Sequence, residues 1–141
     1  MKNIICSIIL AFFALVFHSA NAFDNTPSAA EVAAKVKGQW KLISFEKGGE
    51  KVHYENRNIV WSFDGRYLSV ESDDLGGKIE GSYRLKRSVY KISPTFIILC
   101  DELDKTHLPH GKLVVGSVEN DSMTLIDWNK EVEYILQRTN N

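Results

Sequence analysis

The sequence predicts an all-β protein, a small antiparallel up-and-down β-barrel of about eight strands with one short N-terminal helix. Short runs rich in β-branched and aromatic residues recur at a spacing of roughly 8–12 residues, as in sandwiches and barrels. Turn-forming pairs such as Asp64-Gly65 and Gly76-Gly77 separate these runs. No helical stretches alternate with the runs, so a parallel sheet is not expected.

The first 22 residues have the pattern of a secretory signal peptide. Lys2 supplies a positive charge, residues 4–17 are almost wholly apolar, and Ser19-Ala20-Asn21-Ala22 forms a small-residue cleavage site. The apolar run is shorter than the roughly 20 residues that a membrane-spanning helix needs. We therefore predict a signal peptide over 1–22, one mature domain over 23–141, and a periplasmic or secreted location.

The size and charge of the mature domain exclude some classes of function. Removal of 22 residues from 141 leaves 119, enough for one hydrophobic core. The mature part has 16 basic and 18 acidic residues, a formal charge of −2, without a block of like charge. This pattern argues against nucleic-acid binding, against attachment to anionic lipid and against a membrane-embedded chain, and leaves a homodimer open.

Cys100 is the one cysteine of the mature part, so an internal disulfide is not expected. It ends the apolar run 96–99, which favours a buried thiol. An intermolecular disulfide or a reactive thiol stays open.

The helix is expected directly after a short leader. Ser28 and Glu31 have the spacing of a capping box, and Gly38 ends the pattern. Apolar side chains recur at helical spacing between them, at Ala29, Val32, Ala33 and Val36.

Strands are expected over most of the remaining chain. The Asp64-Gly65 pair predicts a tight hairpin with positive φ at both residues, and Lys86-Arg87 is read as a second tight connection. Apolar residues lie on both faces of several strands, which favours a barrel whose outside is partly covered. The predicted strands are 40–45, 59–63, 66–70, 78–85, 88–92, 95–100, 112–118, 122–128 and 131–138.

Three segments together resemble the bacterial lipocalin-like (calycin) domains, which are small up-and-down barrels. They are Gly38-Gln39-Trp40-Lys41-Leu42, Phe63-Asp64-Gly65-Arg66-Tyr67 and Tyr134-Ile135-Leu136-Gln137-Arg138. The resemblance implies that residues 23–141 form one lipocalin-like barrel. It also implies that Trp40 packs inside a closed barrel end and that Arg138 covers it.

Signatures of catalysis are absent from the sequence. There is no G-x-S-x-G, and the glycine pairs read as hairpin turns rather than phosphate loops. Asp104, His107 and His110 could bind a divalent metal, but Pro109 between the histidines removes any helical spacing. We therefore expect a solvated loop over 101–111, no metal, no cofactor and no enzymatic activity.

Two functions remain. The first is an exported carrier of a small apolar ligand, with the barrel lined by Trp40, Trp61, Phe63 and Tyr67. The alternative is that these aromatic side chains only pack in the hydrophobic core. The second function is a periplasmic inhibitor or immunity protein that blocks a cell-wall hydrolase or a secreted toxin by protein contact, through Asp73, Asp74, Asp101, Glu102, Asp104 and His107.

Overall fold

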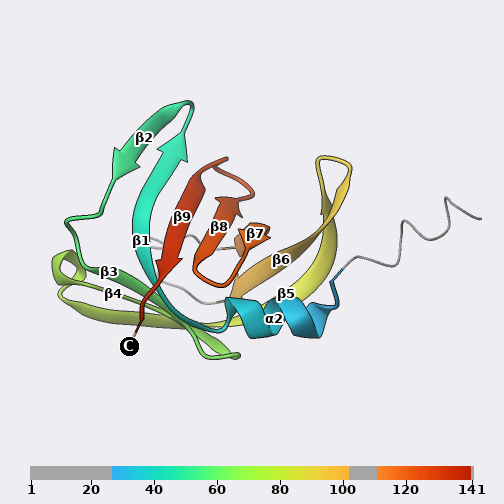
Figure 1. Cartoon of the computed structure of the whole chain (residues 1–141), viewed down its shortest axis with the longest axis horizontal. Helices are drawn as coiled ribbons and strands as arrows, with labels where there is room; N and C mark the ends of the chain where they lie inside the picture. The colour runs from blue at the N-terminus through green and yellow to red at the C-terminus, as the bar shows by residue number, and fades with distance from the viewer. Residues whose placement is uncertain (1–26, 102–110, 141) are drawn as a thin grey trace, which may run out of the picture.

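The computed structural model describes residues 27–101 and 111–140, which form a closed antiparallel β-barrel (Figure 1). Neighbouring strands follow the chain order around the barrel, and pairing of β1 with β9 closes it. Eight strands make the wall, and β2 is an extra strand on β1, so the predicted fold class is confirmed. The strands are β1 (Gly38–Lys47), β2 (Glu50–His53), β3 (Ile59–Phe63), β4 (Tyr67–Ser72), β5 (Gly77–Tyr90), β6 (Ser93–Asp101), β7 (Gly111–Val118), β8 (Ser122–Asp127) and β9 (Glu133–Arg138).

Helix α2 (Ala29–Val36) lies at the end of the barrel where β1 begins and β9 ends (Figure 1). The predicted capping box is present: the Ser28 hydroxyl accepts from the Glu31 backbone N–H at 3.2 Å, and the Glu31 carboxylate accepts from the Ser28 N–H at 2.6 Å. Val32 and Val36 are buried and join the barrel core. An eight-residue helix is marginal alone, so this apolar side anchors it.

The β3–β4 hairpin forms where it was predicted, but its turn begins one residue later. Gly65 has a φ of 109°, whereas Asp64 is not among the residues with positive φ. The Asp64 carboxylate instead accepts from the backbone N–H groups of Arg66 and Tyr67, both at 2.7 Å. The expectation of positive φ at both residues is therefore wrong, because Gly65-Arg66 is the two-residue loop, with glycine at its first position.

The predicted connection at Lys86-Arg87 is also wrong. β5 runs unbroken through both residues, which pair with Ile97 and Phe96 of β6. Lys86 is exposed, and the Arg87 guanidinium lies 5.8 Å from the Phe96 ring centre, so two adjacent long cations fit a strand without breaking it.

The core fills the inside of the barrel with side chains from every wall strand and from α2. The Cys100 thiol is buried in it, as predicted. Ile97 and Val114 have the opposite register to Ile98 and Leu113 and are also buried, so part of the outer face is covered. The largest side chains with almost no exposure are Trp40, Phe63, Leu68, Ile98, Leu113, Met123, Leu125 and Leu136.

The predicted signal peptide, residues 1–22, lies outside the described residues. In residues 27–101 and 111–140, none of the helices has the length and apolar character needed to cross a membrane.

Candidate functional site

One end of the barrel is sealed by the pair that the resemblance pointed to. Trp40 is completely buried, and its ring nitrogen donates to the Val36 carbonyl of α2 at 2.8 Å. The Arg138 guanidinium carbon lies 4.1 Å from the centre of the Trp40 ring. The predicted neighbourhood of Trp40 and Arg138 is confirmed, and it fixes the helix, the first strand and the last strand together.

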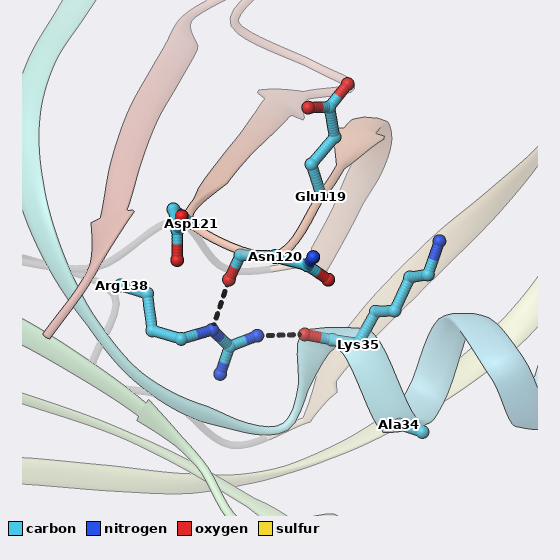
Figure 2. A pocket seen from close by; sticks show the side chains of 6 residues that line it. All are labelled: Ala34, Lys35, Glu119, Asn120, Asp121 and Arg138. Carbon is cyan, nitrogen blue, oxygen red and sulfur yellow. Dashed lines mark hydrogen bonds between the residues drawn. The ribbon is translucent and has the colours of Figure 1, made fainter. Parts of the chain in front are cut away.

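Arg138 also donates three hydrogen bonds to backbone carbonyls, of which Figure 2 shows those to Lys35 and Asn120. The acceptors are Lys35 at 2.7 Å and Lys37 at 3.0 Å, at the end of α2, and Asn120 at 2.6 Å, in the β7–β8 turn. Cations stabilise helix C-termini, and the planar guanidinium suits several acceptors at once. A Cβ on Gly38 would lie 2.5 Å from an Arg138 nitrogen, so only glycine fits there.

A polar pocket of about 510 Å³ opens to solvent beside this arginine (Figure 2). Its charged groups are of both signs, and the Arg138 guanidinium is already occupied by carbonyls. The pocket therefore suits water better than an apolar ligand. It is lined by Ala34, Lys35, Glu119, Asn120, Asp121 and Arg138.

Three of the four predicted lining aromatics lie together inside the barrel. Trp40 and Trp61 are cross-strand partners, and Trp61 and Phe63 share the inner face of β3. The fourth, Tyr67, is 47% exposed, so the prediction that it lines the interior is wrong. The reason is strand alternation: Leu68 pairs with Phe63 and points inward, which turns Tyr67 outward.

The side away from α2 has an aromatic cluster, which we define as Phe45, Tyr54, Trp61 and Tyr134. The Trp61 and Tyr134 ring centres are 5.3 Å apart, and those of Phe45 and Tyr54 are 5.5 Å apart. Burial raises the pKa of Tyr134 to about 12, with smaller contributions from the charge of Asp127 and from Tyr54. Tyr134 pairs with Leu125, and Asp127 is the next inward-facing residue of β8, so the cluster lies close to a carboxylate.

Asp127 is the unusual residue of this region, with only 1% of its surface exposed. One carboxylate oxygen accepts from the backbone N–H groups of Asn129 and Lys130, both at 2.9 Å, and so holds the β8–β9 turn. The other oxygen, Oδ2, is buried and has no hydrogen-bond partner among the residues that the structure describes. Asp127 pairs with Leu113, a core residue, so its side chain is on the inner face.

Sequence reasoning missed Asp127 and three members of the aromatic cluster. A signal was present, because Met123, Leu125 and Asp127 alternate along β8 and a carboxylate takes the third inward position. Phe45, Tyr54 and Tyr134 carried no such signal. The β1–β2 hairpin brings Tyr54 to Phe45, and the closure of β1 on β9 adds Tyr134.

The residues of the inhibitor hypothesis are only partly described. Asp73 and Asp74 are exposed in a short 3-10 helix, η2 (Asp73–Leu75), and Asp74 forms a 2.9 Å salt bridge with Arg57. Asp101 is the last residue of β6. Glu102, Asp104 and His107, with His110, lie outside the described residues. Within the part of the chain that the structure describes, no three His, Cys, Asp or Glu side chains gather as metal ligands.

The geometry thus gives a barrel sealed at one end by Trp40 and Arg138, with aromatic rings and a buried carboxylate away from that seal. Comparison of the chain with family models, with curated proteins and with solved structures gives no match.

Proposed function

We propose that this chain is an exported, lipocalin-like binding protein without catalytic activity, and that its ligand is a small, mainly apolar molecule. Side chains fill the inside of this eight-stranded barrel, so we place the ligand at a barrel end and not in its centre. The seal of Trp40 and Arg138 at one end supports entry from the other, where the aromatic cluster lies.

The Asp127 Oδ2 atom is the observation that carries the proposal. Buried acceptors nearly always have a donor, and an unsatisfied one costs free energy. A ligand hydroxyl, amide or ammonium placed beside Tyr134 would supply the missing donor. The rings of the aromatic cluster would contact the apolar part of the same ligand. We therefore expect a ligand that combines an apolar body with at least one hydrogen-bond donor.

Isothermal titration with a matched ligand panel tests this proposal. Each apolar body is offered with a hydroxyl or amine and, as a control, with a methyl ether that cannot donate. We expect Asp127→Asn to weaken binding of the donor ligands about tenfold. The asparagine keeps the oxygen that holds the turn and replaces Oδ2 with a donor, so the fold is retained. Asp73→Asn, an exposed acid in η2, is the control and should change nothing. Equal affinity of parent and Asp127→Asn would refute the role of Oδ2.

A second pair of variants separates the carrier from the inhibitor. Trp61→Ala alters the barrel interior, and Asp101/Glu102/Asp104→Ala alters the acidic segment. Loss of ligand binding in the first variant alone supports the carrier. Loss of hydrolase inhibition in the second alone, with no ligand found, would favour the inhibitor.

A further inference from the structure

The β5–β6 hairpin carries a conspicuous apolar tip. The hairpin projects from the barrel beside α2 (Figure 1, yellow). At its end Ile92 is 96% exposed and Val89 is 58% exposed, the two largest exposures among the large apolar residues that the structure describes. Such side chains contribute nothing to the core, so folding does not explain them.

The tight turn at the tip requires backbone angles that its two residues disfavour. Lys91 and Ile92 have φ values of 45° and 66°. A two-residue turn with both φ positive favours Asn-Gly, and a β-branched residue in this region is a genuine outlier. Strain kept at an exposed position is a reason to look for a function there.

Aromatic rings and lysines surround the apolar tip. Tyr90 packs edge-on against Trp128 of the β8–β9 turn, with ring centres 5.0 Å apart. The Lys91 amine lies 5.3 Å from the Tyr90 ring centre, and the Lys112 amine lies 5.3 Å from that of Trp128. Tryptophan, tyrosine and snorkelling lysine are the residues enriched where a protein meets a lipid headgroup region.

Charge favours an anionic surface. The distal part of the hairpin, residues 82–100, includes four basic residues and no acidic one, whereas Glu80 and Asp101 lie at its base. The four are Arg84, Lys86, Arg87 and Lys91. The mature chain as a whole is slightly acidic, so the attraction is local to this hairpin. The sequence argued against lipid attachment because it has no run of like charge. The fold places Lys112 and Trp128 beside the hairpin tip and so gathers basic and aromatic side chains that are far apart in the sequence.

We propose that Val89, Tyr90, Lys91, Ile92 and Trp128, here named the docking tip, bind the barrel to the surface of a bilayer that contains anionic phospholipid. The apolar side chains enter the headgroup region while Lys91 and Lys112 contact lipid phosphates. With two aliphatic side chains at the contact, the attachment is shallow and reversible. It does not depend on the proposed ligand.

Vesicle sedimentation and tryptophan fluorescence test the proposal on the full mature chain. The probes are phosphatidylcholine vesicles with and without phosphatidylglycerol. We expect binding to the anionic vesicles only, reduced in about 0.5 M NaCl. Trp40 and Trp61 are buried, so a blue shift of emission on binding would report Trp128.

Ile92→Gly is the decisive variant, because glycine accepts the positive φ and removes only the apolar side chain. We expect its partition onto anionic vesicles to fall about fivefold or more. Val52→Ser, which alters a 41% exposed valine on β2, is the matched control and should bind like the parent. Failure of the parent to bind, equal binding of Ile92→Gly, or equal binding to neutral vesicles would each overturn the proposal. Capture of a purified hydrolase by the tip in place of vesicles would assign it to a protein partner.

Discussion

Arg138 is the residue that joins most parts of the fold. From β9 its guanidinium lies over the Trp40 ring and donates hydrogen bonds to carbonyls of α2 and of the β7–β8 turn. The same guanidinium occupies the space that a Cβ on Gly38 would need. The start of the domain, α2 and β1, therefore meets the β7–β8 turn and β9 at one side chain. Arg138 stabilises the fold through its shape as well as its charge, because the three carbonyl acceptors need the fixed spacing of the N–H groups on a guanidinium.

We predict that Arg138→Lys lowers the free energy of unfolding by about 1–3 kcal/mol, although the charge is kept. Lysine cannot stack flat on Trp40 and reach all three carbonyls. Trp40→Ala should cost about 3–5 kcal/mol, because the ring is fully buried. Urea unfolding measures both. Arg66→Lys, on an exposed turn, is the control with no expected change. A neutral Arg138→Lys would mean that the seal is not structural.

Tyr134 gives a pH dependence whose sign follows from its burial. Its pKa is raised from 10.0 to about 12, because burial disfavours the phenolate. Below pH 10 the ring is neutral in both states and its contribution to stability is complete. As the pH rises towards 12, the unfolded chain ionises first, so this contribution is lost.

We therefore expect the urea midpoint to fall between about pH 9 and about pH 11.5, and to fall less in Tyr134→Phe. Tyr67→Phe alters an exposed ring and should follow the parent curve. If both variants lose stability in parallel with the parent, Tyr134 is not the titrating group.

At the scale of elements, the β5–β6 hairpin departs most from what sequence rules favour. Its turn lies at Lys91-Ile92, where neither residue favours positive φ, whereas Lys86-Arg87 lies within the strand. Two adjacent cations interrupt the apolar pattern at Lys86-Arg87, but the pairing of β5 with β6 continues through them and places the turn at Lys91-Ile92. The remaining strands and α2 were found from their local signals, apart from the exposed strand β2, whose four residues have no apolar alternation.

We predict that the double change Lys91→Asn/Ile92→Gly stabilises the protein by about 1 kcal/mol, because Asn-Gly accepts both positive φ values. The same pair of residues placed at Lys86 and Arg87 should destabilise it, since glycine weakens a strand interior. Thermal unfolding compares the two. A destabilised turn variant would show that the side chains at 91 and 92 make contacts that matter for folding.

At the scale of the whole molecule, the class of barrel and the inward position of Trp40, Trp61 and Phe63 were predictable from the sequence, and most of the remaining site was not. Strand spacing and turn residues are local, and they sufficed to predict an up-and-down meander. The contact of Tyr134 with Trp61 depends on the closure of β1 on β9, and the docking tip depends on the contact of Tyr90 with Trp128. Asp127 alone had a local signal, its place in the alternation along β8. Tyr67 faces outward because the register of β4 on β3 pairs Leu68 with Phe63, and register decides which face a residue takes.

Export is the prediction that concerns the chain as a whole, because both the carrier role and the docking tip are useful only where the protein meets its ligand and a membrane surface. Residues 1–22 predict cleavage after Ala22, so mass spectrometry of protein recovered from a bacterial periplasmic fraction should find Phe23 at the N-terminus. Replacement of both small residues, Ala20→Asp/Ala22→Asp, should block cleavage and leave a longer, membrane-retained species. Val70→Ile, a buried change in β4, controls for effects on folding alone and should be processed normally. Recovery of the parent from membranes with Met1 still attached would remove the export assignment and, with it, the carrier role proposed for the barrel.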